Sequence, residues 1–133
     1  MNMKAIRKST TLFCLIFGLF LSAWIPMEFP VVQEDATPLV LVIKGEGPIT
    51  PVLIEYIQRA EKIAERRGAE AIIFEFDTTG GSVDTMNKIV EAIRSSSTPI
   101  VVYVYPQNAM AASAGTVITL AGHVAAMAPE TTI

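Results

Sequence analysis

Two short segments of small residues could together carry out nucleophilic chemistry. Ser113 lies in the run Ala111-Ala112-Ser113-Ala114-Gly115, where small neighbours leave room for a substrate carbonyl beside the hydroxyl. Gly80 and Gly81 follow an apolar run, and their amides can approach a ligand without a side chain in the way. Acyl transfer needs a nucleophile and amides that stabilise an oxyanion. Ser113, the Gly80-Gly81 loop and the amide of Ala114 could supply these groups.

The same residues also permit plainer interpretations. Gly80-Gly81 could be only a turn between a strand and a helix, and Ser113 only a small residue in a crowded helix. A third interpretation is phosphate binding by the loop 78–82. That loop lacks both the GxGxxG pattern and the lysine of a P-loop. Residue types alone therefore leave a turn and a catalytic site both open.

The elements that must position these loops alternate between strand and helix. Short apolar runs rich in β-branched residues predict strands at 39–44, 71–76, 100–105 and 124–127. Apolar residues at helical spacing predict helices at 51–67, 83–93 and 111–121. Thr50 and Ser82 are candidate N-caps, and Gly68 is a helix stop.

This β-α-β-α-β-α-β order predicts an α/β fold with a buried parallel sheet and right-handed crossovers. Sites in such sheets gather at the carboxyl ends of the strands. The loops 78–82 and 106–113 both leave such ends, so we expect them to lie side by side. No helix follows the strand at 124–127, so the predicted fold is interrupted at its C-terminal side.

Composition excludes several classes of function. The chain is 51% hydrophobic and 17% charged, so it should fold, and its net charge is -3. Nucleic acid is not an expected partner, because no basic patch with interleaved aromatic residues is present. The single cysteine, Cys14, and the single histidine, His123, exclude a site built from several such ligands. We therefore expect no metal and no cofactor.

The first 25 residues have the pattern of a secretory signal. Lys4, Arg7 and Lys8 precede an apolar run of about 15 residues, shorter than the roughly 20 that span a bilayer. Ala23 offers a small residue for cleavage. Residues 1–25 are therefore predicted to be a signal peptide or membrane anchor, and 26–38, with three prolines, a linker. The domain at 39–133 should then work on the extracytoplasmic side of a membrane.

Four motifs in the second half of the chain occur together in a known order. They are Asp77-Thr78-Thr79-Gly80-Gly81, the strand 99–104, the run 111–116, and Ala126-Met127-Ala128-Pro129. In sequence and spacing, this set resembles the membrane-associated ClpP-class peptidases of the NfeD family, the operon partners of stomatin-like proteins. The resemblance implies a ClpP/crotonase-like fold at 39–133, C-terminally incomplete here.

The resemblance also implies an activity. Ser113 would be the nucleophile of a serine endopeptidase, and Gly80, Gly81 and Ala114 would supply its oxyanion hole. Expected substrates are peptides or hydrophobic stretches of membrane proteins. A stomatin-like partner, membrane association and a homo-oligomer are also implied.

Three residues depart from the family pattern. Thr79 stands where the family usually has proline, and Asn108 and Glu130 stand where it has glycine. Asparagine tolerates unusual backbone angles. A carboxylate at 130 could alter the end of the last strand close to the site.

The general base is the missing component. The family pairs its serine with a lysine further along the chain, but no lysine follows Ser113 here. Lys44, Lys62 and Lys88 precede the site and match no base position. His123 is a weak alternative, because it resembles the start of a strand. We expect the gene to continue beyond Ile133 with a lysine roughly 30 to 50 residues after Ser113, since a serine nucleophile needs a base.

Two other classes of protein remain as alternatives. The chain could be a truncated or degenerate, non-catalytic module that acts as a binding partner in a membrane assembly. A crotonase-type acyl-CoA enzyme would share the fold and an oxyanion hole without needing Ser113. The predicted secretory signal argues against that class, because CoA is intracellular.

Overall fold

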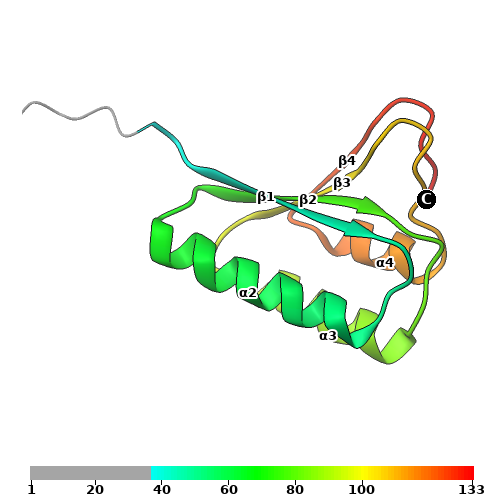
Figure 1. Ribbon diagram of the computed structural model, residues 1–133, viewed down its shortest axis with the longest axis horizontal. Coiled ribbons are helices and arrows are strands. Elements are labelled where there is room, and N and C mark those ends of the chain that lie inside the picture. Colours follow the sequence, from blue (N-terminus) through cyan, green and yellow to red (C-terminus); the bar gives the residue numbers. More distant parts are fainter. Residues whose placement is uncertain (1–36) are drawn as a thin grey trace, which may run out of the picture. The chain divides into compact units, whose positions relative to one another are not determined.

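Seven elements alternate along residues 37–133, the part of the chain that the computed structural model describes (Figure 1). They are β1 (Val40–Glu46), α2 (Pro51–Arg67), β2 (Ala71–Asp77), α3 (Val83–Ser95), β3 (Ile100–Val104), α4 (Ala114–Ala121) and β4 (Val124–Met127). The predicted signal or anchor at 1–25 and nearly all of the predicted linker at 26–38 lie outside the described residues. No helix within 37–133 is both long and apolar enough to cross a membrane.

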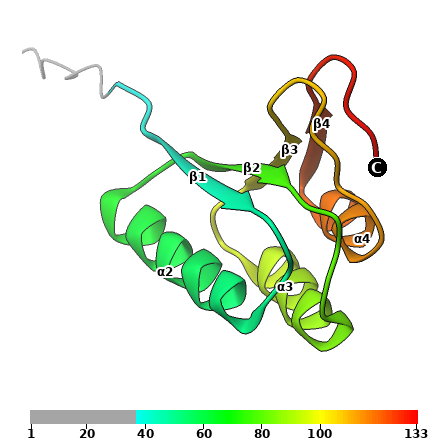
Figure 2. The same ribbon diagram turned by 45° about the vertical axis from the view of Figure 1, so that its right-hand side comes forward.

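The four strands form one parallel sheet, as predicted, and their order within it is β1-β2-β3-β4. All three helices lie on the same face of this sheet, which Figures 1 and 2 show from two directions. The strand order never reverses, and crossovers of one hand then place every helix on one side. The core lies between the two layers. Phe74 and Phe76, with ring centroids 4.7 Å apart, are fully buried there together with Val102 and Ile118.

The opposite face of the sheet differs from the prediction of a sheet buried on both sides. Within the described residues, no helix covers it. Val42, Ile73, Val101 and Val124 stand in register across this face. The two outer members, Val42 and Val124, are 50% and 54% exposed. The apolar runs predicted the strands correctly, but only the helix-covered side of each strand is closed from solvent.

Helix ends follow their local sequence, with one exception. Gly68 ends α2 in the left-handed conformation (φ 64°), and its amide donates to the last turn. Ser82 caps α3 by accepting the amide of Thr85 at 3.2 Å. Thr50 occupies the N-cap position of α2, but its side chain makes no capping bond.

Several predicted element boundaries differ from the structure by one to three residues, and two of these differences have a clear cause. β1 continues through Gly45 to Glu46, because that part still pairs with β2, where Gly45 lies opposite Phe76. The helix predicted at 111–121 begins only at Ala114. The helix begins late because a tertiary contact, the pairing of Ala111 with Thr78, keeps Ala111 in an extended conformation.

Candidate active site

The carboxyl edge of the sheet brings the two predicted site loops together. The amide of Thr78 donates to the carbonyl of Met110 at 2.6 Å, and the amide of Ala112 donates to the carbonyl of Thr78 at 3.0 Å. These bonds extend the pairing of β2 and β3 beyond the ends of both strands. As a result, a Cβ atom on Gly80 would lie 3.0 Å from the Cβ atom of Ser113. The sequence predicted that these two loops would lie side by side, and they do.

Ser113 stands at a strained turn between this extended segment and α4. Its φ of 56° and ψ of -117° are rare for a residue with a side chain, at a cost of roughly 1–3 kcal/mol. The residue is exposed, and its side chain makes no capping bond to the helix. A sharp turn that leaves a serine hydroxyl free at the top of a sheet is how several hydrolases present their nucleophile.

The amides of the two glycines have different surroundings. The amide of Gly80 donates to the hydroxyl of Thr78 at 3.0 Å inside the protein. The amide of Gly81 has no acceptor among residues 37–133. Of the two glycine amides predicted to contribute to an oxyanion hole, only that of Gly81 therefore lacks an acceptor within the described residues. Gly80 serves the site in another way, because any side chain there would press on Ser113 and on the carbonyl of Ala112.

Ile49 holds the glycine loop from the other side. Its amide donates to the carbonyl of Gly80 at 2.9 Å, and its carbonyl accepts the amide of Ser82 at 3.0 Å. A Cβ atom on Gly81 would lie only 2.6 Å from the Ile49 backbone, so this packing requires glycine. Because Gly81 is held between these two bonds, the direction of its amide is fixed before any ligand binds.

The amide of Ala114, the other candidate oxyanion donor, also has no acceptor in the described chain. It is the first residue of α4, where amides have no acceptor within the helix and the helix dipole favours a negative charge. The next two amides are occupied, because Gly115 donates to Ala112 and Thr116 donates to Ser113. Ala114 thus carries the free amide directly after the Ser113 hydroxyl.

His123 has a structural role at the amino edge of the sheet. Its Nδ1 accepts the amide of Ile100 at 3.1 Å, and its own amide donates to the Ile100 carbonyl at 3.0 Å. Ile100 begins β3, whereas Ser113 follows the other end of that strand. Nδ1 of His123 is therefore already bonded, and the residue lies at the edge of the sheet opposite to Ser113.

The three lysines of the described chain do not supply a base either. Lys44 pairs with Glu75 at 3.3 Å, and this carboxylate raises the pKa of the lysine, whereas a lysine base needs a lowered pKa. Lys62 and Lys88 border the hollows between α2 and α3. The expectation that none of them is the base agrees with these positions.

The two departures at glycine positions have a visible structural cost. Asn108 (φ 65°) and Glu130 (φ 61°) both take the left-handed conformation that glycine prefers. Gln107 Nε2 donates to Glu130 Oε2 at 2.8 Å, which joins the loop after β3 to the segment after β4. Glu130 thus lacks the conformational freedom of the glycine found in the family, and its carboxylate instead forms a hydrogen bond between two loops near the site.

Sequence reasoning missed the residues that hold the loops in place. Thr78 is 2% exposed, and it contacts both the glycine loop and the segment before Ser113. Thr132 accepts the amide of Ala111 at 2.8 Å and extends the same pairing by one more segment. The motif around Asp77 showed that Thr78 belongs to the loop. Pairing between distant segments leaves no local pattern in the sequence, so nothing in the sequence indicated the role of Thr132.

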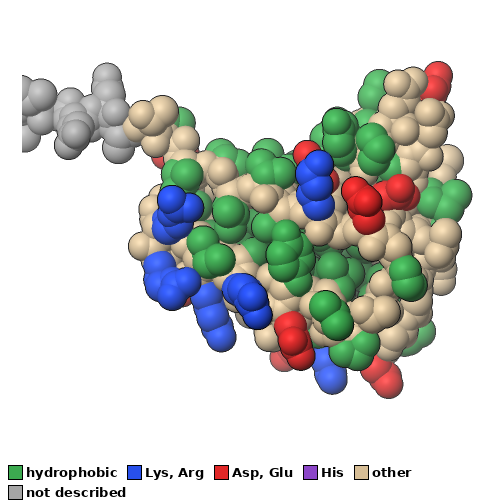
Figure 3. All heavy atoms as spheres, in the orientation of Figure 1, with side chains coloured by type: hydrophobic (Ala, Val, Ile, Leu, Met, Phe, Trp, Pro, Cys, Tyr) green, Lys and Arg blue, Asp and Glu red, His purple; other side chains and the backbone are tan. Residues whose placement is uncertain are grey.

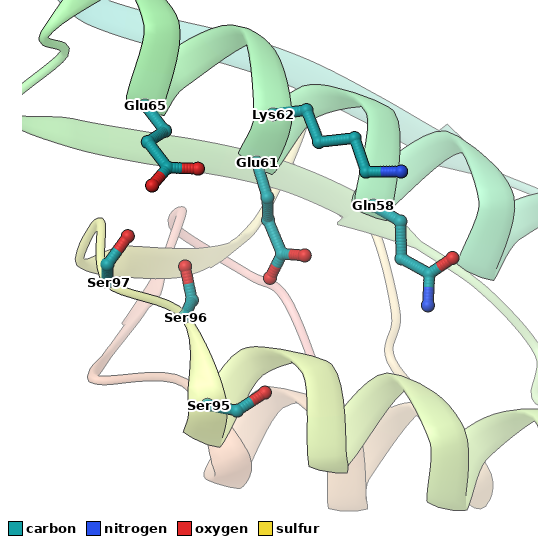
Figure 4. Close-up of a pocket in the computed structure, with 7 residues that line it drawn as sticks. All are labelled: Gln58, Glu61, Lys62, Glu65, Ser95, Ser96 and Ser97. Atoms are coloured by element: carbon teal, nitrogen blue, oxygen red, sulfur yellow. The ribbon is translucent and has the colours of Figure 1, made fainter.

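Two hollows between α2 and α3 lie away from these loops. One, of about 370 Å³, opens between the C-terminal ends of α2 and α3, which lead into the amino ends of β2 and β3 (Figure 4). Its lining residues are Gln58, Glu61, Lys62, Glu65, Ser95, Ser96 and Ser97. Figure 3 shows basic side chains gathered over α2, whereas apolar and acidic side chains border the opposite end of this face.

The fold places the chain in a known structural class. ClpP1 of Listeria monocytogenes, solved as an asparagine-to-aspartate variant, superposes with a TM-score of 0.59 over 69% of this chain and 52% of that chain. The two sequences are 23% identical, so this likeness concerns the fold alone. The predicted ClpP-like α/β fold is thereby confirmed.

Within that class, the chain belongs to the NfeD1b family, because the model of the NfeD1b N-terminal domain matches residues 39–133. A relative, the membrane-bound protease PH1510 of Pyrococcus horikoshii, is 48% identical over 98 residues. The match covers 74% of this chain and 22% of the relative, so the chain spans about a fifth of that protein's length.

Solved structures of a related protease match the fold closely. One is a serine-to-alanine variant of the 1510-N membrane-bound stomatin-specific protease, 47% identical with a TM-score of 0.70. Another is a lysine-to-alanine variant of the same protease in complex with a substrate peptide, 48% identical with a TM-score of 0.70. The matches cover 72% of this chain and 46% and 44% of those chains. The resemblance inferred from the motifs is confirmed.

Proposed function

We propose that this chain carries the nucleophile and the oxyanion hole of a membrane-associated ClpP-class serine endopeptidase. One observation carries the proposal: the exposed, strained Ser113 packs against the glycine loop at Gly80, and the amides of the adjoining residues Gly81 and Ala114 have no acceptor within the described residues. The relatives named as proteases support it. Of the predicted oxyanion donors, Gly81 and Ala114 act directly, and Gly80 leaves space for the nucleophile.

The reaction follows from these groups. A neutral lysine amine takes the proton of the Ser113 hydroxyl as Oγ attacks the carbonyl carbon of a peptide bond. The carbonyl oxygen becomes an oxyanion, and the amides of Gly81 and Ala114 donate to it. The lysine then protonates the leaving amine, which leaves an acyl ester on Ser113. Attack by water on that ester releases the carboxylic acid and restores the serine.

The lysine of this Ser-Lys dyad belongs to the part of the protein that follows Ile133. Among residues 37–133, neither His123 nor any lysine stands where a base is needed. The related protease was solved as a serine variant and as a lysine variant. The separation of those two positions falls within the roughly 30 to 50 residues expected here between Ser113 and its base.

The substrate is an extended, hydrophobic peptide segment of a membrane protein, and a stomatin-like protein is the partner we expect. The names of the relatives, a stomatin-specific protease and its complex with a substrate peptide, support both parts. Membrane association through residues 1–25, an extracytoplasmic position and a homo-oligomer complete the proposal.

A non-catalytic role is the second candidate. Glu130, in a strained backbone conformation, stands where the family has glycine and bonds across to Gln107. In this alternative, substitutions of this kind have removed activity, and the domain keeps only its contacts with a partner protein.

Labelling of the full-length protein with a fluorophosphonate probe tests the proposal. We expect the probe to modify Ser113, because it reacts with activated serines, and Ser113→Ala to abolish labelling. Ser95→Ala, a change at an exposed serine at the end of α3, is the matched control and should label normally. Absence of labelling in the wild-type protein would favour the non-catalytic alternative. Labelling that survives Ser113→Ala would place the nucleophile elsewhere.

A further inference from the structure

Thr78 contacts both halves of the proposed oxyanion hole. It follows β2 directly and is 2% exposed, although its hydroxyl is polar. The hydroxyl accepts the amide of Gly80 at 3.0 Å. This bond turns the Gly80 amide into the protein, and the amide of the next residue, Gly81, is left without an internal acceptor among residues 37–133.

The backbone of Thr78 fixes the approach to Ser113. Its amide donates to the carbonyl of Met110 at 2.6 Å, and its carbonyl accepts the amide of Ala112 at 3.0 Å. Ala112 immediately precedes Ser113. The segment 110–112, which leads into the strained turn at Ser113, is therefore hydrogen-bonded to both the amide and the carbonyl of Thr78.

The methyl group of Thr78 supports the helix that carries the second amide. A Cβ atom on Gly115 would lie 2.5 Å from Thr78 Cγ2, so the first turn of α4 rests directly on this methyl group. Gly115 follows Ala114, whose amide is free. One side chain thus touches the glycine loop through its oxygen and the nucleophile helix through its carbon.

We propose that Thr78 is a positioning residue that sets the direction and separation of the Gly81 and Ala114 amides. This inference rests on the proposed peptidase function. Two substitutions separate the parts of the side chain: valine keeps the methyl group and loses the hydroxyl, whereas serine keeps the hydroxyl and loses the methyl group. We expect the hydroxyl contact to matter more for the rate. A defect in the hydroxyl contact should misdirect Gly81, which affects the developing oxyanion more than the bound substrate.

Peptide cleavage by the full-length enzyme and its Thr78→Val, Thr78→Ser and Thr119→Val variants tests this role. Thr119 is the matched control, because it is fully buried and its hydroxyl donates to a carbonyl within α4. For Thr78→Val we expect kcat to fall by roughly 10- to 100-fold with KM changed less than about twofold, a partial loss of one oxyanion donor. Thr78→Ser should keep kcat within about threefold of wild type, and Thr119→Val should keep it unchanged.

Amide hydrogen exchange provides a readout that does not depend on turnover. Gly80 should exchange faster in Thr78→Val than in Thr78→Ser, because only valine removes its acceptor. If Thr78→Val lowers thermal stability but leaves kcat intact, Thr78 is merely structural and the inference is wrong. If wild-type enzyme shows no cleavage that depends on Ser113, the proposed function fails and the positioning role fails with it. Active wild type with an equally active Thr78→Val refutes the positioning role alone.

Discussion

The loops at the two edges of the sheet differ in their hydrogen bonds and in their backbone conformation. At the amino edge, Ile100 and His123 exchange two hydrogen bonds, and the amide of Ala69 closes the end of α2 on Ala64. At the carboxyl edge, the amides of Gly81 and Ala114 have no acceptor within 37–133. All non-glycine residues of the described chain with positive φ also lie there: Asn108, Ser113 and Glu130.

This difference has a physical explanation. Strained backbone costs free energy, so it persists only where surrounding structure holds it. Here the support is the extra pairing among the segments around Ile49, Thr78, Ala111 and Thr132. At the amino edge, bonds such as those of the Glu70 amide to Leu39 and the Ile72 amide to Pro99 also join neighbouring segments, but no non-glycine residue of the described chain there has a positive φ. Among the non-glycine residues of the described chain, strained backbone is thus confined to the carboxyl edge.

The largest effect should come from a pair of glycine substitutions at the two edges. Gly80→Ala and Gly68→Ala each force alanine into a positive φ, 107° and 64°, at a cost of roughly 1–2 kcal/mol. Only at Gly80 would the new methyl group also press on Ser113, whereas nothing lies within 4 Å at Gly68. Gly80→Ala should reduce kcat/KM of the full-length enzyme by about 100-fold or more, since small misplacements cost that much.

Thermal melts and peptide cleavage, measured on both variants, check this pair. Gly68→Ala should melt at a lower temperature and cleave at the wild-type rate. Equal loss of activity in both variants would mean that the carboxyl edge has no special geometry to protect.

A smaller effect, on stability alone, is expected at His123. His123→Ala removes the acceptor of the buried Ile100 amide and should cost about 1 kcal/mol of unfolding free energy. His123→Asn is the control, because its Oδ1 can accept the same amide and should restore most of that loss. Chemical denaturation measures the cost. A loss of cleavage activity without a loss of stability would revive His123 as a catalytic base.

The smallest effect concerns Glu61 and depends on pH. Burial raises the pKa of the Glu61 carboxyl above its usual 4.5, and the nearby Ser96 hydroxyl partly opposes this shift. The folded protein therefore holds its proton more tightly than the unfolded chain, so folding is disfavoured once pH rises above the unfolded value. Below that value both states are protonated and the penalty is absent.

Glu61→Gln should consequently raise the melting temperature at neutral pH, and the gain should shrink as pH falls toward 4.5. Melting curves of both proteins across this range measure the difference. A gain that is the same at every pH would show that the carboxyl charge is not its cause. Cleavage activity should not change, since Glu61 lines the hollow between α2 and α3 (Figure 4).

Most of the fold was predictable because its signals are local. Apolar runs located all four strands of the described chain within a few residues, and Gly68 and Ser82 marked helix ends that the structure confirms. The errors occurred where a distant segment overrides local preference. Ala111 has a sequence suited to a helix, but its pairing with Thr78 keeps it extended.

The sequence predicted that Gly80, Gly81 and Ser113 would lie close together, but not how the two glycine amides would be bonded. Gly80 and Gly81 look equivalent in the sequence, yet one amide is bonded to Thr78 and the other is free. The conformation of Ser113 could not be predicted either, because small neighbours permit many backbone angles. Contacts among four segments that are far apart in the chain select one of them.

The sequence by itself determined the strand and helix order, the family and the residues gathered at the carboxyl edge, because periodicity, caps and motifs depend on near neighbours. Only the tertiary structure decided which amides remain without an acceptor and which backbone conformation Ser113 adopts. It also decided that His123 lies at the amino edge of the sheet. These features depend on hydrogen bonds between segments remote in sequence, and such bonds form only when the parallel strands have already set the register.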